Sequence, residues 1–110
     1  MFWGKYFVNG QWSDKTFEGF NVINPATEEV YGNFPLASKE VIDEAVAAAR
    51  KAFASWKKES RVKRSEYFDK LAQLVKRDHD KLKNAISIET GKTLNESHAE
   101  VIEALHMCQT

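Results

Sequence analysis

The pattern of apolar and polar residues changes character near residue 37. Upstream, short apolar stretches are separated by turn-forming residues; downstream, apolar residues recur with a period of about 3.6. The first two stretches, residues 6–8 and 11–12, flank Asn9-Gly10. Because Asn and Gly tolerate the positive φ angles of a two-residue type I′ turn, we predict a β-hairpin here.

A second hairpin is predicted immediately afterwards. The apolar stretch 20–23 ends at Asn24-Pro25, where proline fixes φ and lacks the N–H donor that a central strand needs. A returning strand is expected to begin near Val30. We therefore expect residues 1–36 to consist of strands and turns.

Four helices are predicted in residues 37–110 from the apolar spacing and the capping residues. Ser38 and Ser60 can cap the first two helices. Gly91 suits the end of the third, because glycine enters the left-handed region without steric penalty. The expected buried faces of the first two helices comprise Ile42, Ala45, Ala49, Phe53 and Trp56, and then Tyr67, Phe68, Leu71, Leu74 and Val75.

The last helix is expected to begin with a capping box. Thr93 and Glu96 have the T-x-x-E spacing in which each side chain accepts a hydrogen bond from the other residue's backbone N–H. No Gly, Asn or Pro ends this helix before Thr110, so we expect the chain to be part of a larger fold. The expected buried residues of the last two helices are Leu82, Ala85 and Ile86, and then Leu94, Val101, Ile102 and Leu105.

Composition narrows the class of protein. The length of 110 residues suits one domain, and 43% hydrophobic with 29% charged residues is typical of a globular chain. Lys and Arg number 16 and balance 16 Asp and Glu, which removes the electrostatic reason to expect a nucleic-acid partner. No apolar run approaches the ~18 residues of a membrane span. The single cysteine, Cys108, excludes an internal disulfide, and we expect a cytoplasmic protein.

Gly91-Lys92-Thr93 resembles the end of a phosphate-binding Walker A loop, but the pattern is incomplete. The motif requires a glycine five residues before its last glycine, and Ile86 stands at that position. It also requires a preceding strand, whereas a helix is predicted. We interpret the segment as the end of one helix and the cap of the next.

Cys108 and the three histidines form no recognisable catalytic or metal-binding pattern. No nearby base or oxyanion donor accompanies Cys108, and its position one turn after Leu105 favours a thiol packed on a helix. His79, His98 and His106 lack a ligand spacing, which favours ordinary surface or boundary positions. Composition and spacing alone therefore predict no assembled active site.

Five segments, taken in order, resemble the aldehyde dehydrogenase superfamily. Residues 6–12 (YFVNGQW) are similar to the family's opening hairpin. Residues 23–30 (INPATEEV) resemble its N-P-A-T-G-E-V turn, with Glu28 at the usual glycine position. The other similar segments are residues 35–53 with the following Trp56, residues 89–93 (ETGKT), which resemble E-T-G-K-P, and residues 99–101 (AEV).

The resemblance implies the start of the cofactor-binding domain of an NAD(P)-dependent aldehyde dehydrogenase. In this family a cysteine thiolate attacks the aldehyde, the thiohemiacetal passes hydride to the nicotinamide, and water releases the carboxylic acid. The parent enzyme would be α/β. This chain would be α+β-like, with N-terminal β-hairpins followed by about four α-helices. Residues 1–110 would form an incomplete N-terminal portion of the cofactor-binding domain.

The resemblance transfers no catalytic or cofactor-binding residue, because the matching family positions lie beyond residue 110. Cys108 does not match the family nucleophile. One structural site is implied, in which the backbone carbonyls of Val22 and Ile23 and the carboxylate of Glu89 hold a monovalent cation, K⁺ or Na⁺. The alternative is that Glu89 is only a side chain at the end of its helix and binds no cation.

Two functional hypotheses remain open. In the first, the chain is an inactive N-terminal segment of a homo-oligomeric aldehyde dehydrogenase that uses NAD or NADP and a small aldehyde. That segment would bind the cofactor feebly and would have no membrane or nucleic-acid partner. In the second, the chain is a stand-alone α+β module that binds a protein partner or oligomerises through an exposed apolar helical face.

Overall fold

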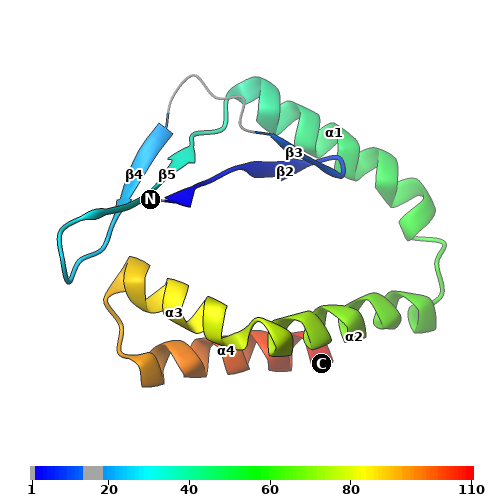
Figure 1. Ribbon diagram of the computed structural model, residues 1–110. Helices are drawn as coiled ribbons and strands as arrows, with labels where there is room; N and C mark the ends of the chain where they lie inside the picture. The colour runs from blue at the N-terminus through cyan, green and yellow to red at the C-terminus, as the bar shows by residue number, and fades with distance from the viewer. Residues whose placement is uncertain (1, 14–18) are drawn as a thin grey trace. The chain divides into compact units, whose positions relative to one another are not determined.

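The computed structural model describes residues 2–13 and 19–110 and contains strands followed by helices (Figure 1). The strands end at Pro35 and the first helix starts at Lys39, which confirms the predicted hairpins followed by four helices. The chain divides into two compact units, of which the first contains Met1–Ile23 and Glu29–Glu59 and the second contains Asn24–Glu28 and Ser60–Thr110.

The first predicted hairpin is confirmed. Strands β2 (Tyr6–Val8) and β3 (Gln11–Ser13) pair antiparallel, and the turn between them places Asn9 at φ 52° and Gly10 at φ 77°. These are the left-handed angles that the Asn-Gly pair predicts. The register sets the Phe7 ring opposite that of Trp12, with 5.0 Å between the ring centroids.

The second hairpin is also confirmed, and it carries an additional strand. Strand β4 (Gly19–Ile23) pairs antiparallel with β5 (Val30–Pro35), with an irregular register between Val22 and Ile23. Strand β1 (Phe2–Trp3) pairs parallel with the other edge of β5, giving the strand order β1-β5-β4. Strand β1 was not expected from the sequence, because a two-residue strand with a distant partner leaves no local periodicity.

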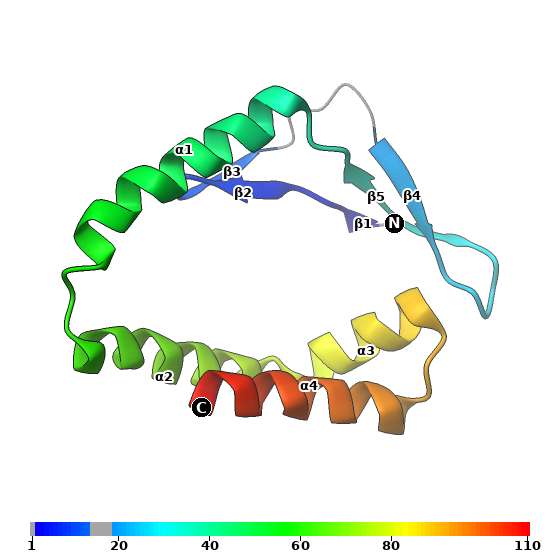
Figure 2. The same ribbon diagram turned by 180° about the vertical axis from the view of Figure 1, so that it is seen from behind.

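Helix α1 (Lys39–Trp56) begins at Ser38, whose hydroxyl accepts a hydrogen bond from the Val41 N–H at 3.3 Å. It contacts β2, and both views of the ribbon place the β2–β3 hairpin beside it (Figures 1 and 2). The half-buried positions on α1 are Val41, Ala45 and Ala48.

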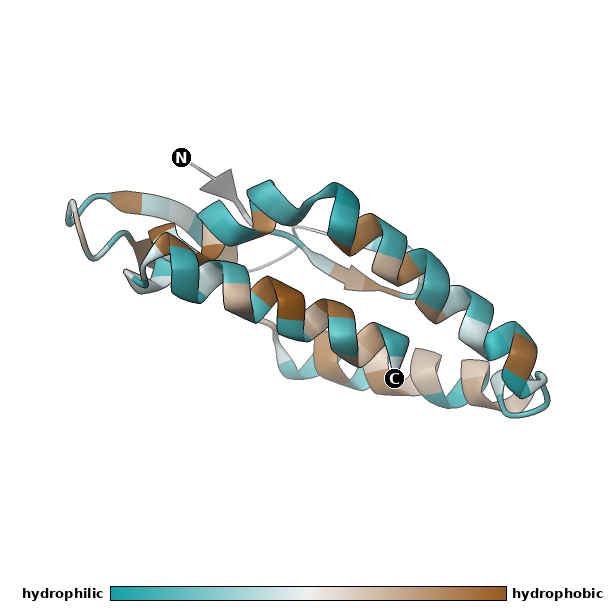
Figure 3. Ribbon diagram, turned by 90° about the horizontal axis from the view of Figure 1, so that it is seen from below, coloured by the Kyte–Doolittle hydropathy of each residue, from teal (hydrophilic) through white to brown (hydrophobic). Residues whose placement is uncertain are grey.

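The expected buried face of α1 is largely wrong. Ile42 is 53% exposed and Phe53 is 57% exposed. Only Ala45 of the predicted set is half-buried; Ala49 and Trp56 are also exposed. The hairpin contacts the narrow side of α1 that carries small residues, so the bulky apolar side has no cover within the described part of this unit. Figure 3 shows the resulting mixture of apolar and polar positions along the helices.

The second unit is built on three helices, α2 (Arg61–Arg77), α3 (His79–Thr90) and α4 (Leu94–Gln109). Helix α4 packs against both α2 and α3. The buried residues are Ala72 from α2 and Ser97 and Val101 from α4. Ser97 is fully buried, and its hydroxyl shares a 2.7 Å hydrogen bond with the hydroxyl of Ser87 on α3.

The expected faces of these helices are confirmed unevenly. On α4, Val101 is buried and Ile102 and Leu105 are half-buried as predicted, whereas Leu94 is 55% exposed. On α3, Ala85 and Ile86 are half-buried and Leu82 is exposed. The prediction for α2 is wrong for four residues, because this helix packs through Ala72 with half-buried Val75. The four exposed α2 residues are Tyr67, Phe68, Leu71 and Leu74.

Candidate functional site

The segment that resembles E-T-G-K forms the connection between α3 and α4. Gly91 ends α3 with φ 76°, and its N–H donates to the Ser87 carbonyl at 2.9 Å. The Thr90 hydroxyl donates to the Ile86 carbonyl at 2.6 Å and accepts from the Lys92 N–H at 3.2 Å. Local hydrogen bonds therefore hold this connection in one conformation.

The predicted capping box is present at the start of α4. The Thr93 hydroxyl accepts from the Glu96 N–H at 3.2 Å, and the Glu96 carboxylate accepts from the Thr93 N–H at 3.1 Å. Lys92 forms an ion pair with Glu100. The structure thus confirms that Gly91-Lys92-Thr93 joins two helices, and the Lys92 ammonium is engaged by a carboxylate.

The two segments that carry much of the family resemblance meet in the second unit. A Cβ placed on Gly91 would lie 2.9 Å from the Cγ atom of Pro25, which belongs to the turn Asn24–Glu28. Within the turn, the Asn24 side chain accepts from the Ala26 N–H at 2.9 Å, and its carbonyl accepts from the Glu28 N–H at 2.8 Å. A glycine is required at position 91 both for φ and for this close approach.

The residues of the predicted cation site lie on separate elements. Val22 is half-buried and Ile23 is exposed, and both belong to β4 at its irregular register. Glu89 is exposed in the last turn of α3. Among the described residues no group of three or more His, Cys, Asp or Glu side chains is arranged to hold a metal ion. Two of the three proposed ligands are backbone carbonyls, which such side-chain groups do not include. The cation site therefore stays a prediction.

Two histidines that no sequence spacing relates are in direct contact. Nε2 of His79, at the start of α3, lies 2.7 Å from Nδ1 of His98 on α4. Nδ1 of His79 lies 3.0 Å from a carboxylate oxygen of Asp80, and the Lys83 ammonium is 3.6 Å from the same oxygen. The hydrogen bond with His79 is the main cause that lowers the pKa of Asp80 below its usual range. No local spacing predicts this cluster, because the two histidines are 19 residues apart on different helices.

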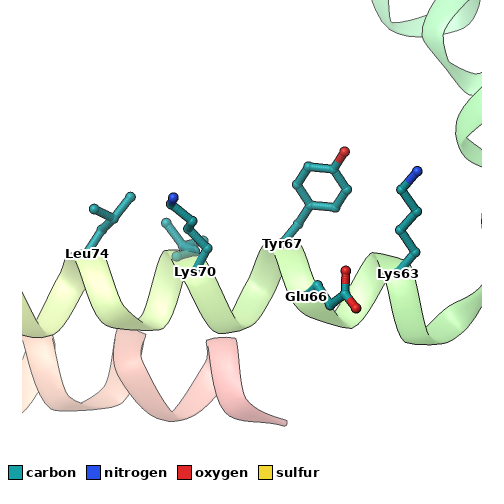
Figure 4. Close-up of a pocket in the computed structure, with 6 residues that line it drawn as sticks. Lys63, Glu66, Tyr67, Lys70 and Leu74 are labelled. Carbon is teal, nitrogen blue, oxygen red and sulfur yellow. The ribbon is translucent and has the colours of Figure 1, made fainter.

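A shallow groove runs along the exposed side of α2. Figure 4 shows Tyr67 and Leu74 projecting from the side of α2 that faces away from α4. The groove is lined by Lys63, Glu66, Tyr67, Lys70, Leu71 and Leu74. This side of α2 is exposed, whereas the side that carries Ala72 is buried.

Cys108 adds no catalytic site, and the described helices include no membrane span. Cys108 is half-buried on α4, in agreement with a thiol packed on that helix. No helix in the described ranges 2–13 and 19–110 is both long and apolar enough to cross a membrane.

Comparison with known proteins places this geometry in a family. The aldehyde dehydrogenase family model matches residues 12–110. Malonate-semialdehyde dehydrogenase 1 of Shouchella clausii is 39% identical over 98 residues, which are 88% of this chain and 20% of that protein. Malonate-semialdehyde dehydrogenase of Lacticaseibacillus casei is 41% identical over the same length, with the same coverage of both chains. The chain therefore spans about a fifth of the length of these curated relatives.

Solved structures give the same result. A methylmalonate-semialdehyde dehydrogenase of Sinorhizobium meliloti, crystallised with NAD, has a TM-score of 0.90 at 31% identity and is matched over 99% of this chain and 22% of its own. An aldehyde dehydrogenase of Bartonella henselae has a TM-score of 0.94 at 28% identity, over 99% of this chain and 24% of its own. This chain therefore belongs to the aldehyde dehydrogenase family.

Proposed function

We propose that this chain is the N-terminal portion of the cofactor-binding domain of an NAD(P)-dependent aldehyde dehydrogenase. The observation that carries the proposal is the family match over residues 12–110, together with a fold that follows an NAD-bound relative over 99% of the chain. The parent enzyme would oxidise an aldehyde to a carboxylic acid through a cysteine thiohemiacetal, with hydride passing to the nicotinamide.

In this proposal the 110 residues act as a scaffold and supply no catalytic group. Cys108 is half-buried on α4 and matches no family nucleophile. The Lys92 ammonium is paired with Glu100. We expect the chain alone to oxidise no aldehyde and to bind NAD or NADP only feebly.

The named relatives support a narrower substrate class for the parent. Relatives at 39% and 41% identity are named for malonate semialdehyde, and a solved neighbour is named for methylmalonate semialdehyde. We propose a short aldehyde that also carries a carboxylate. We further propose that the parent works as a homo-oligomer in the cytoplasm.

A chimera tests the proposal directly. The aligned segment of the Shouchella clausii enzyme would be replaced by this chain, and reduction of NAD would be followed with malonate semialdehyde. We expect a folded chimera that oxidises this substrate. The matched control is the same chimera with its catalytic cysteine replaced by serine, which should be inactive. A chimera that fails to fold, or that folds without oxidising the aldehyde, would contradict the proposal.

One observation favours a second candidate, a stand-alone module that binds a protein or oligomerises. Large apolar side chains such as Phe53 and Tyr67 are 57% and 58% exposed on α1 and α2. An active chimera would decide against this candidate. An inactive but folded chimera, with the chain forming a stable homodimer by sedimentation, would decide for it.

The monovalent cation remains part of the proposal. Carbonyl oxygens of Val22 and Ile23 and the Glu89 carboxylate are hard ligands that suit K⁺ or Na⁺. Titrating either ion at constant ionic strength should raise the thermal midpoint of the wild-type chain. Glu89→Ala should abolish this response, whereas Glu103→Ala, which removes an exposed carboxylate from α4, should preserve it. An unchanged response in Glu89→Ala would exclude the site.

A further inference from the structure

The contact between His79 and His98 joins the start of α3 to the first turns of α4 through two titratable rings. The nitrogens are 2.7 Å apart, and the rings meet edge to face with 4.9 Å between their centroids. The His79 side chain is 25% exposed, so water reaches it only in part. A hydrogen bond this short requires one nitrogen to donate and the other to accept.

Asp80 determines which nitrogen donates when both rings are neutral. An ionised carboxylate only accepts, so Nδ1 of His79 carries the proton that bonds to Asp80 at 3.0 Å. Nε2 of His79 then has a lone pair and must accept. The proton in the contact therefore belongs to Nδ1 of His98.

One additional proton leaves the contact intact, whereas two break it. With one proton added, His79 donates from both nitrogens, to Asp80 and to a His98 ring that now accepts at Nδ1. With two protons added, both facing nitrogens carry hydrogen and both rings are cationic. The contact then has no acceptor, and the two like charges repel each other.

We propose that His79 and His98 form a pH-sensitive clasp between α3 and α4, closed when the pair carries at most one extra proton and open when it carries two. Both helices that meet at the pair carry charged groups. Asp80 and Lys83 of α3 are the nearest. Arg77 and Asp78, which precede His79 in the chain, bond to each other, and Glu100 of α4 is paired with Lys92.

The sign of the pH dependence follows from proton counting. In the unfolded chain the two histidines are apart, and each binds its proton near the ordinary histidine value of about 6.5. The closed clasp holds one proton fewer than the unfolded chain at low pH. Stability therefore rises with pH through this range and is lost on acidification.

Denaturation of the full chain between pH 8 and pH 5, with EDTA present to remove metal ions, tests the clasp. His98→Gln keeps a polar side chain but cannot titrate, and His106→Gln is the matched control on the same helix. We expect the unfolding constant of wild type to rise relative to that of His98→Gln by up to about tenfold per pH unit below pH 6.5, the limit for one proton. His106→Gln should follow wild type. A His98→Gln profile parallel to wild type would overturn the proposal.

Ring-nitrogen NMR provides a readout that does not depend on stability. Long-range ¹H–¹⁵N spectra report which nitrogens of each imidazole carry hydrogen. At pH 8 we expect Nδ1 of both rings to be protonated, and on acidification we expect the pair to titrate in two successive steps. His79→Gln should convert the His98 titration into a single ordinary step. Independent single-step titrations in wild type would refute the clasp.

Discussion

At the scale of single residues, the backbone angles of Glu28 and Gly91 explain why the family motifs have glycine at these positions. Glu28 occupies the usual glycine position of the N-P-A-T-G-E-V turn, and its φ is 62°. A non-glycine residue pays for this left-handed conformation, which explains why glycine suits the position. The motif alone indicates that a glutamate is unusual at this position. The left-handed strain itself becomes evident only from the backbone angle.

Glu28→Gly should stabilise the chain. Relief of the left-handed strain is worth ~1–2 kcal/mol, and the added freedom of glycine in the unfolded chain offsets about half of it. We expect a net gain of about 0.5–1 kcal/mol in the free energy of unfolding by urea denaturation. Glu29→Gly, one residue later and without a positive φ, should destabilise instead. Equal effects of the two substitutions would show that φ is not the cause.

Gly91→Ala and Gly10→Ala form a matched pair. Both positions have nearly the same φ, 76° and 77°, but only position 91 has a close neighbour, the Pro25 Cγ at 2.9 Å. Gly10→Ala should cost about 1–2 kcal/mol for backbone strain alone. Gly91→Ala should cost about 1 kcal/mol or more beyond that, measured in the same denaturation experiment. Pro25→Ala in the Gly91→Ala background should recover part of the difference.

At the scale of elements, capping residues predicted the helix ends better than apolar spacing predicted the helix faces. Ser38, Ser60 and Thr93 all cap the helices that they were expected to cap. These motifs depend on neighbouring residues only. Which face of α1 or α2 is buried depends on the partner, and the described partners contact the small residues Ala45 and Ala72. The bulky apolar residues of α1 and α2 are largely exposed instead.

Thr93→Ala should remove the capping box at α4. We expect a loss of about 1 kcal/mol in the free energy of unfolding, because the Glu96 N–H loses its acceptor. Ser60→Ala, which removes a simple cap at the Lys63 N–H of α2, should cost a similar amount but should leave α4 intact. Amide hydrogen exchange distinguishes them, since only Thr93→Ala should speed exchange in the first turn of α4.

At the scale of the whole molecule, the fold class and family were predictable, but the candidate sites were predictable only in part. Five segments in order indicated the family, because each motif is a short run of consecutive residues that can be read directly from the sequence. The Pro25–Gly91 approach and the His79–His98 pair were missed, since each joins residues that no periodicity relates. Contacts between distant segments depend on tertiary packing, and a single sequence holds no direct record of it.

The exposed apolar stripe of α1 should drive the isolated chain to self-associate. Ile42, Val46 and Phe53 are each more than half exposed on one side of this helix. Phe53→Glu should weaken association by about tenfold or more, because burying a phenylalanine is worth ~1.5–3 kcal/mol. Lys51→Gln lowers the net charge by the same single unit on the opposite side of α1 and should change association little. Sedimentation velocity over a concentration series measures both, and a monomeric wild-type chain would contradict the expectation.

The division of the chain into units has a consequence for modularity. The helical unit takes Asn24–Glu28 from between two strands of the other unit, so neither unit is one continuous stretch of chain. A single gene crossover near residue 60 would transfer α2, α3 and α4 without the proline that abuts Gly91. An exchange that keeps this contact must therefore carry the segment Asn24–Glu28 and the three helices together.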